Sequence, residues 1–223
     1  MTIAAASTVA LLLADARLPS GGHAHSAGME PALLGGMPAT DVAAFLTQRA
    51  RTTALVDAGA AVAAMHAVLD GDGRGLAPVE RAWSARTASS AMRETSRELG
   101  RGLLRLARRI WPSAHGIGEL GEAPPRPLVL GVIAAEVEMT AEELVRLAVY
   151  DDLASAVAAL LKLEPRDPAE GVTLVLQACA SVEPAVASIA AIWSPDDIPA
   201  LSAPQAEAWA ERHATTPRRL FRG

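Results

Sequence analysis

The stretch that decides the fold is LLLADARLPSGGHAHSAGME, residues 11–30, where an alanine-rich helical pattern gives way to a block of unlike residues. Pro19 cannot continue a helix, and Gly21 and Gly22 can adopt backbone conformations that other residues avoid. Ser26 is a suitable cap for a helix that follows. We therefore predict a shaped turn held between two helices.

The composition favours an all-α fold. Hydrophobic residues make up 51% of the 223 residues but aromatic residues only 3%, and most apolar side chains are Ala, Leu and Val. Small side chains suit close packing of helix on helix, and the alternating pattern of strands is scarce. We predict a multi-helix bundle that forms a single domain over residues 1–223.

Charge and cysteine usage narrow the functional classes. The net charge of −5 argues against general binding to nucleic acid or to an anionic membrane, because both need a surplus of basic residues. Cys179 is the only cysteine, so no internal disulfide can form and a reducing cytoplasm suits the chain. Asp15 and Arg17 cut the apolar run near the N-terminus, which favours neither a signal peptide nor a membrane span.

Glycine clusters and capping residues divide the first half of the chain. The expected helices cover residues 8–16, 41–69 and 78–110, with another that begins near Ser26. Thr40 is the expected cap of the helix over residues 41–69, and a glycine-rich segment at 71–75 ends that helix. We expect the helix over residues 78–110 to bend near residues 88–91, where consecutive serines compete for backbone hydrogen bonds.

The second half begins with a Pro- and Gly-rich segment, residues 111–127, which predicts either a long surface loop or a boundary between sub-bundles. Thr140 and Glu143 have the spacing of a capping box, for a helix that reaches residue 163. Asp167, ahead of a proline and an acidic residue, predicts the start of the next helix. A turn-rich stretch after Trp193 leads into a short helix and a basic tail, residues 212–223.

His23 and His25 raise the question of a metal site, since neutral imidazole binds Ni, Zn or Cu. Residues two apart do not share a helix face, so both can bind one ion only from a turn or an extended backbone. No cysteine or carboxylate lies close enough in sequence to complete a site. We expect a turn that packs on the bundle or on a partner, and no permanent metal site.

Arginines recur at spacings of seven, four, four, four and three, which places them along one helical face: Arg86, Arg93, Arg97, Arg101, Arg105 and Arg108. One interpretation is a solvated face with intrahelical ion pairs, and the other is contact with acidic partner surfaces. Gly100 and Gly102 lie in the same helix, where each costs about 0.8–1 kcal/mol relative to Ala. Close approach of another backbone would compensate that cost.

Lys162 is the only lysine and stands in the apolar sequence AALLKLEP. At a helix end it either extends to solvent, where the helix dipole favours a cation, or faces a partner.

The tail places Arg218, Arg219 and Arg222 around Leu220 and Phe221. Such a segment is either a frayed terminus or a short motif that orders on binding.

No catalytic motif is found. The chain has no Walker-type glycine loop, no HExxH, no GxSxG and no Cys–His pairing at a meaningful spacing. Asp151 and Asp152 lie in a helix where partial exposure is expected rather than acid–base chemistry. We therefore predict that the protein is not an enzyme.

Three segments together resemble the UreF family of urease accessory proteins. The first resembles the N-terminal LPxGGxxxSxGxE block of that family and comprises Leu18, Pro19, Gly21, Gly22, His25, Ser26, Gly28 and Glu30. The second resembles the "GRxLL" helix and comprises Arg97, Gly100, Arg101, Leu103 and Leu104. The third resembles the "RHxT…RLFR" tail and comprises Arg212, His213, Thr215, Arg219, Leu220, Phe221 and Arg222. The chain departs from the family at residues 165–168, at Ala214 and at Pro217.

The resemblance implies a helical, non-enzymatic maturation factor that acts as a homodimer in the cytoplasm. Such a factor bridges UreD and the GTPase UreG and supports GTP-dependent insertion of nickel into the urease apoprotein, with no tightly bound cofactor of its own. The three segments and Lys162 would form or support the partner-binding surfaces, and His23 with His25 would at most contact nickel in transit. The alternative from another class is a small-molecule-binding α-helical regulatory module, which needs a sizeable internal cavity with residues 18–26 as its lid.

Overall fold

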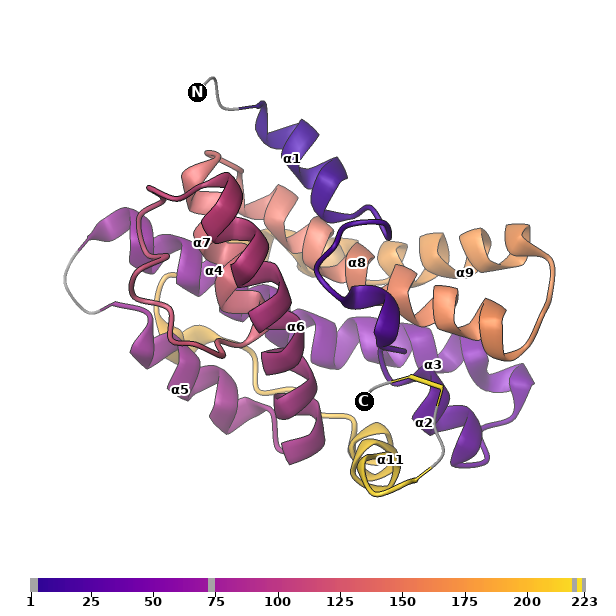
Figure 1. The fold of residues 1–223 in the computed structure, drawn as a ribbon. Helices are drawn as coiled ribbons and strands as arrows, with labels where there is room; N and C mark the ends of the chain where they lie inside the picture. Colours follow the sequence, from indigo (N-terminus) through magenta and orange to yellow (C-terminus); the bar gives the residue numbers. More distant parts are fainter. Residues whose placement is uncertain (1–3, 72–74, 218–219, 222–223) are drawn as a thin grey trace.

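The structure is a computed structural model that describes residues 4–71, 75–217 and 220–221. These residues fold into helices joined by turns and loops, with no strand among them, around one continuous hydrophobic core (Figure 1). The predicted all-α bundle in a single domain is therefore confirmed.

The elements before residue 71 are α1 (Ala6–Leu13), a 3₁₀ turn (Gly22–Ala24), α2 (Met29–Leu34), a 3₁₀ turn (Ala39–Asp41), α3 (Val42–Arg49), a π-helical turn (Ala50–Ala54) and α4 (Leu55–Asp70). Two predicted caps are wrong. Gly28, and not Ser26, is the residue at the N-cap of α2, because the left-handed turn at Gly28 delays the helix. Thr40 lies inside a 3₁₀ turn and caps nothing, since Pro38 starts that turn early.

The predicted helix over residues 41–69 is present as the continuous run α3, π turn and α4. The π turn coincides with threonines whose hydroxyls bond the preceding turn. Thr52 Oγ1 donates to the Gln48 carbonyl at 2.7 Å, which competes with the regular backbone pattern.

The expected bend near residues 88–91 is a full break. The chain forms α5 (Ala77–Arg86) and α6 (Ser90–Ile110), separated by three residues. Ser89 has an extended backbone and its hydroxyl accepts a hydrogen bond from the Met92 amide at 3.2 Å. The serine therefore caps a new helix instead of bending an old one.

After a loop that ends at residue 125, the elements are α7 (Arg126–Glu136), α8 (Ala141–Leu163), α9 (Pro168–Ala180), a 3₁₀ turn (Glu183–Ala185), α10 (Val186–Ala190), a 3₁₀ turn (Pro195–Asp197) and α11 (Pro204–Ala214). The capping box of Thr140 and Glu143 is confirmed, with both reciprocal hydrogen bonds present. Asp167 caps α9 as predicted, through the Ala169 amide at 2.9 Å.

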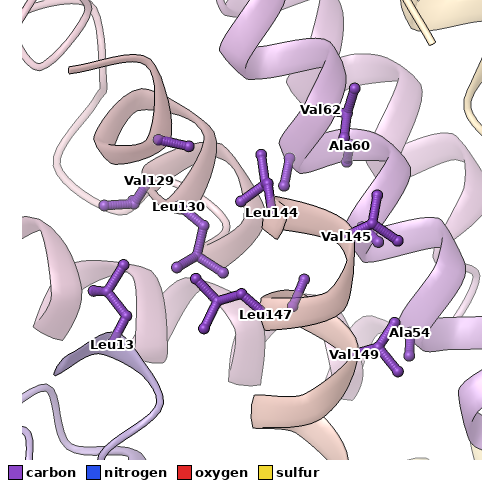
Figure 2. Packing of buried hydrophobic residues seen from close by; sticks show 14 of the residues in the cluster. Leu13, Ala54, Ala60, Val62, Val129, Leu130, Leu144, Val145, Leu147 and Val149 are labelled. Atoms are coloured by element: carbon purple, nitrogen blue, oxygen red, sulfur yellow. The ribbon is translucent and has the colours of Figure 1, made fainter. Parts of the chain in front are cut away.

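The core is built around α4, which packs against α5, α7, α8 and α10. Figure 2 shows Leu144 of α8 between Leu130 of α7 and the residues Ala60 and Val62 of α4. Gly131 of α7 lies so close to α4 that a Cβ atom there would clash with the Ala61 carbonyl oxygen. Alanine and glycine thus allow the close helix packing that the composition predicts.

The loop over residues 111–125 belongs to the same domain, because Trp111, Ile117 and Leu120 are buried in the core. Two helical stretches, Ala39–Asp70 and Pro168–Ala190, are long and apolar enough to cross a membrane, with 67% and 28% of their most apolar windows buried in the fold. Such stretches are weak support for a span, since core helices of bundles have the same composition.

Candidate partner-binding site

The structure brings together the three segments that the sequence singled out. Figure 1 shows the turn before α2, the helix α6 and the helix α11 in the same region of the molecule, and α11 packs against both α2 and α6. Residues almost two hundred positions apart are in contact there. The three segments therefore form one composite surface, which we call the composite site.

Helix α6 approaches two other backbones through its glycines. A Cβ atom at Gly102 would clash with the Ser20 carbonyl oxygen in the N-terminal turn. A Cβ atom at Gly100 would clash with the Pro124 carbonyl oxygen in the loop before α7. The close approach expected from the sequence is thus confirmed at both glycines, and it fixes the N-terminal turn against α6.

Glu30 joins the N-terminal block to the tail. Its carboxylate accepts a hydrogen bond from the Leu220 amide at 2.6 Å and another from the Phe221 amide at 2.9 Å. The Nε2 atom of His213 lies 3.0 Å from the same carboxylate, and the side chains of both partners are almost fully buried. A buried carboxylate with several N–H donors is well satisfied, so this contact holds the tail firmly.

Helix α11 has two further anchors. Glu211 accepts hydrogen bonds from the Ala91 amide at 3.0 Å and the Ser89 hydroxyl at 2.7 Å. The Ala91 contact first, and then the Ser89 contact, hold the pKa of its carboxyl below the usual range. The carboxylate thereby caps the first turn of α6 from a separate helix. Trp209 packs on Phe45 with ring centroids 6.4 Å apart, over Gly35, where a Cβ atom would clash with the indole.

Lys162 lies near the C-terminal end of α8, and its Nζ is 5.3 Å from the centre of the Phe221 ring. This cation–π contact is compatible with the exposed position expected for the lysine. Phe221 itself is buried, so the tail does not fray at this residue.

The arginine face is divided between internal and exposed positions. Arg86 lies in α5, outside the stripe, and donates to the Ile198 carbonyl at 2.6 Å. Arg97 pairs with Glu80 at 2.9 Å, whereas Arg101 pairs with Glu94 at 3.5 Å and lies 3.9 Å from Glu98, and both arginines are half-buried. The remaining arginines of the stripe, Arg105 and Arg108, are exposed. Intramolecular pairs thus occupy part of the stripe, and its C-terminal half faces solvent.

The two histidines of the turn lie in different environments. His23 is exposed, whereas His25 is buried with its Nε2 atom 3.9 Å from a Glu98 carboxylate oxygen. Within residues 4–71, 75–217 and 220–221, no three His, Cys, Asp or Glu side chains form a group that could hold a metal ion.

The predicted site residues separate into two groups by exposure. The exposed or half-buried ones are Pro19, Gly21, Gly22, His23, Gly28, Arg97, Arg101, Lys162, Arg212 and Leu220. The buried ones are Leu18, His25, Ser26, Glu30, Gly100, His213 and Phe221. Arg219 and Arg222 lie outside the described residues.

Sequence analysis missed a network of charges behind the composite site. Arg49 donates to both carboxylate oxygens of Asp152 at 2.7 Å each, and Arg126 donates to Asp151 at 2.6 Å. Asp57 accepts a hydrogen bond from the Trp83 indole at 2.6 Å. No local pattern announces these contacts, because the partners lie on different helices and up to 103 positions apart.

Comparison with known proteins agrees with the resemblance seen in the sequence. The family model of UreF matches residues 38–179. The chain is 37% identical over 219 residues to the urease accessory protein UreF of Mycobacterium sp. (strain JLS), covering 96% of this chain and 97% of that protein. It is also 37% identical to the UreF protein of Mycobacterium marinum, covering 96% of this chain and 99% of that protein. The identity to the UreF protein of Mycobacterium tuberculosis is 37% as well, covering 96% of this chain and 97% of that protein.

Proposed function

The chain belongs to the UreF family of urease accessory proteins, whose members support urease maturation, and we propose that it does so as a bridge between other proteins. In this proposal it joins UreD to the GTPase UreG and so supports GTP-dependent insertion of nickel into the urease apoprotein. The chain itself catalyses no reaction. Nickel is the cargo of the complex and not a resident cofactor of this chain.

The composite site is the observation that carries the proposal. A bridging protein needs a rigid surface assembled from several segments, because preorganised contacts lose less entropy on association. Gly102 against Ser20 and Glu30 against the tail supply that rigidity. Exposed side chains remain on the same surface, including Leu220, which is 67% exposed although the residue after it is buried.

The exposed group has the chemistry of a protein interface. Leu220 offers an apolar contact, while Arg101 and Arg212 offer guanidinium groups at its margin. Arginine is enriched at interfaces because its planar donor fork matches carboxylates on a partner. The net charge of −5 supports protein partners over nucleic acid or an anionic membrane. The proposal places the protein in the cytoplasm as a homodimer.

Co-purification with the urease-linked GTPase tests the proposal, in the presence of the UreD protein. The full chain is expected to be retained with both partners, and a chain that lacks residues 212–223 is expected to lose them.

A pair of point variants separates contact from folding. Leu220→Asp changes an exposed side chain and is expected to weaken retention while the thermal unfolding midpoint stays unchanged. Asp196→Asn, an exposed substitution in the turn before α11, is the matched control and is expected to leave both quantities unchanged. Retention of the complex by the tail deletion would contradict the role given to the tail, and GTP hydrolysis by the purified chain alone would contradict a purely bridging role.

A further inference from the structure

A cavity of about 230 Å³ lies behind the composite site. Its walls come from α1, the N-terminal turn, helices α3 to α8, α11 and the tail, and they include Leu18, Val56, Leu130 and Phe221. Apolar cavities of about 150 Å³ already accommodate benzene in other proteins, so this one has room for a small organic molecule. The small-molecule alternative raised by the sequence requires such a space.

Two carboxylates on the cavity wall form no ion pair with a described residue, those of Asp57 and of Glu207, and Glu207 accepts a hydrogen bond from the Ala203 amide. Arg49 is paired with Asp152, and Arg126 with Asp151, so these four side chains neutralise one another. Asp57 also lines the cavity but forms no ion pair with any described residue. Trp83 donates to one of its oxygens, and no described residue donates to the other.

The surroundings of Asp57 make its charge costly. Burial and the nearby Asp152 carboxylate raise the pKa of Asp57 to about 6, against the opposing effects of the Trp83 hydrogen bond and the Arg49 and Arg126 guanidinium groups. The carboxyl is therefore ionised at neutral pH without a counter-charge. Asp57 is half-buried, and a half-buried charge without an ion-pair partner favours binding of a group that neutralises it.

We propose that this cavity binds a small primary amine in its protonated form, with the ammonium group on Asp57 and a short alkyl body against the apolar walls. An ammonium group supplies both the positive charge and the N–H donor that the second carboxylate oxygen needs. The hydroxyl groups of Thr53 and Ser155 also line the cavity and can accept the remaining N–H bonds.

The chemistry around Asp57 excludes the other simple guests at that residue. The described residues provide no three-ligand group for a metal ion. At Asp57 itself an anion would meet a like charge, so an anion would have to bind at Arg86 or Lys162, which also line the cavity. A neutral alcohol would leave the charge of Asp57 unbalanced. This inference goes beyond the bridging role, because it concerns a ligand inside the chain and not a protein on its surface.

Calorimetric titration of the full chain with propylammonium chloride tests the proposal, with propanol and potassium chloride as parallel probes. We expect saturable binding of propylammonium at pH 7.5, and no comparable binding of either other probe. Asp57→Asn is expected to weaken the affinity by roughly tenfold or more, because the variant loses the counter-charge. Asp15→Asn is the matched control, since Asp15 also lines the cavity but is already paired with Arg17.

The affinity of the unaltered chain for propylammonium, measured over a series of pH values, tests the proposal without any substitution. Protons compete with the amine for Asp57, so the affinity is expected to fall by about tenfold for each pH unit below about 6. The proposal is wrong if propylammonium does not saturate, if propanol or potassium binds equally well, if Asp57→Asn binds as tightly as the original chain, or if the affinity does not change between pH 7.5 and pH 5.

Discussion

Substitution of Glu30 by glutamine should loosen the tail from the bundle. The carboxylate accepts hydrogen bonds from the Leu220 and Phe221 amides at 2.6 and 2.9 Å, with His213 Nε2 at 3.0 Å. Glutamine keeps a single acceptor oxygen, and its NH₂ group turns toward at least one of these donors. One or two charge-assisted hydrogen bonds are lost at about 1.5–3 kcal/mol each, so we expect the free energy of unfolding to fall by about 2–4 kcal/mol.

Two measurements test the effect of Glu30→Gln. Urea denaturation monitored by circular dichroism gives the free energy of unfolding, and amide hydrogen exchange reports on the Leu220 and Phe221 N–H groups themselves. A local loss of about 3 kcal/mol corresponds to roughly 100-fold faster exchange at these two amides. Glu122→Gln, an exposed substitution in the loop before α7, serves as the control and should stay within about 0.5 kcal/mol. Unchanged exchange at both amides in Glu30→Gln would refute the reasoning.

Three further substitutions address other parts of the structure. Gly102→Ala should lower the free energy of unfolding by about 1–3 kcal/mol in chemical denaturation, because the new Cβ atom clashes with the Ser20 carbonyl oxygen. Gly118→Ala is the control and should leave that free energy unchanged, because no atom lies near the new Cβ atom. The pKa of Asp57 is raised to about 6, so the stability that its protonated form contributes is present below about pH 4 and lost as the pH rises through 6. Asp57→Asn should remove this dependence of the unfolding free energy on pH. At pH 7.5 the variant should be more stable by up to about 3 kcal/mol, as measured in thermal or urea melts. Glu211→Gln should weaken the cap of α6 and cost about 0.5–1 kcal/mol by the same measurements, and an unchanged midpoint would contradict that cap.

Much of the fold could be predicted from the sequence because the relevant signals are local. The capping box at Thr140 and the Asp167 cap depend on residues within three positions, and both were predicted correctly. The errors arose where two local signals compete. Ser26 has the chemistry of a cap, but the left-handed turn at Gly28 moves the helix start, and the serines before α6 end a helix that periodicity alone would continue.

The composite site was predictable in its members but not in its contacts. Resemblance placed Glu30, His213 and Phe221 in segments of interest, yet only the fold shows that they touch one another. The ion pairs of Arg49 and Arg126 gave no signal at all, because each joins residues on separate helices. A contact between distant positions depends on the packing of the whole bundle, which no local pattern records.

The separation of the motif residues by burial changes how their roles should be interpreted. Glu30, Gly100 and His213 are buried by contacts within this chain, so a substitution at any of them alters the surface indirectly, by moving the elements that carry it. In the proposed bridging role, direct contacts with partners would instead come from residues at the surface, such as the half-buried Arg101 and the exposed Leu220. Under that proposal, a variant can lose partner binding for two physically distinct reasons. Only variants of the exposed group that leave the free energy of unfolding unchanged can locate the interface.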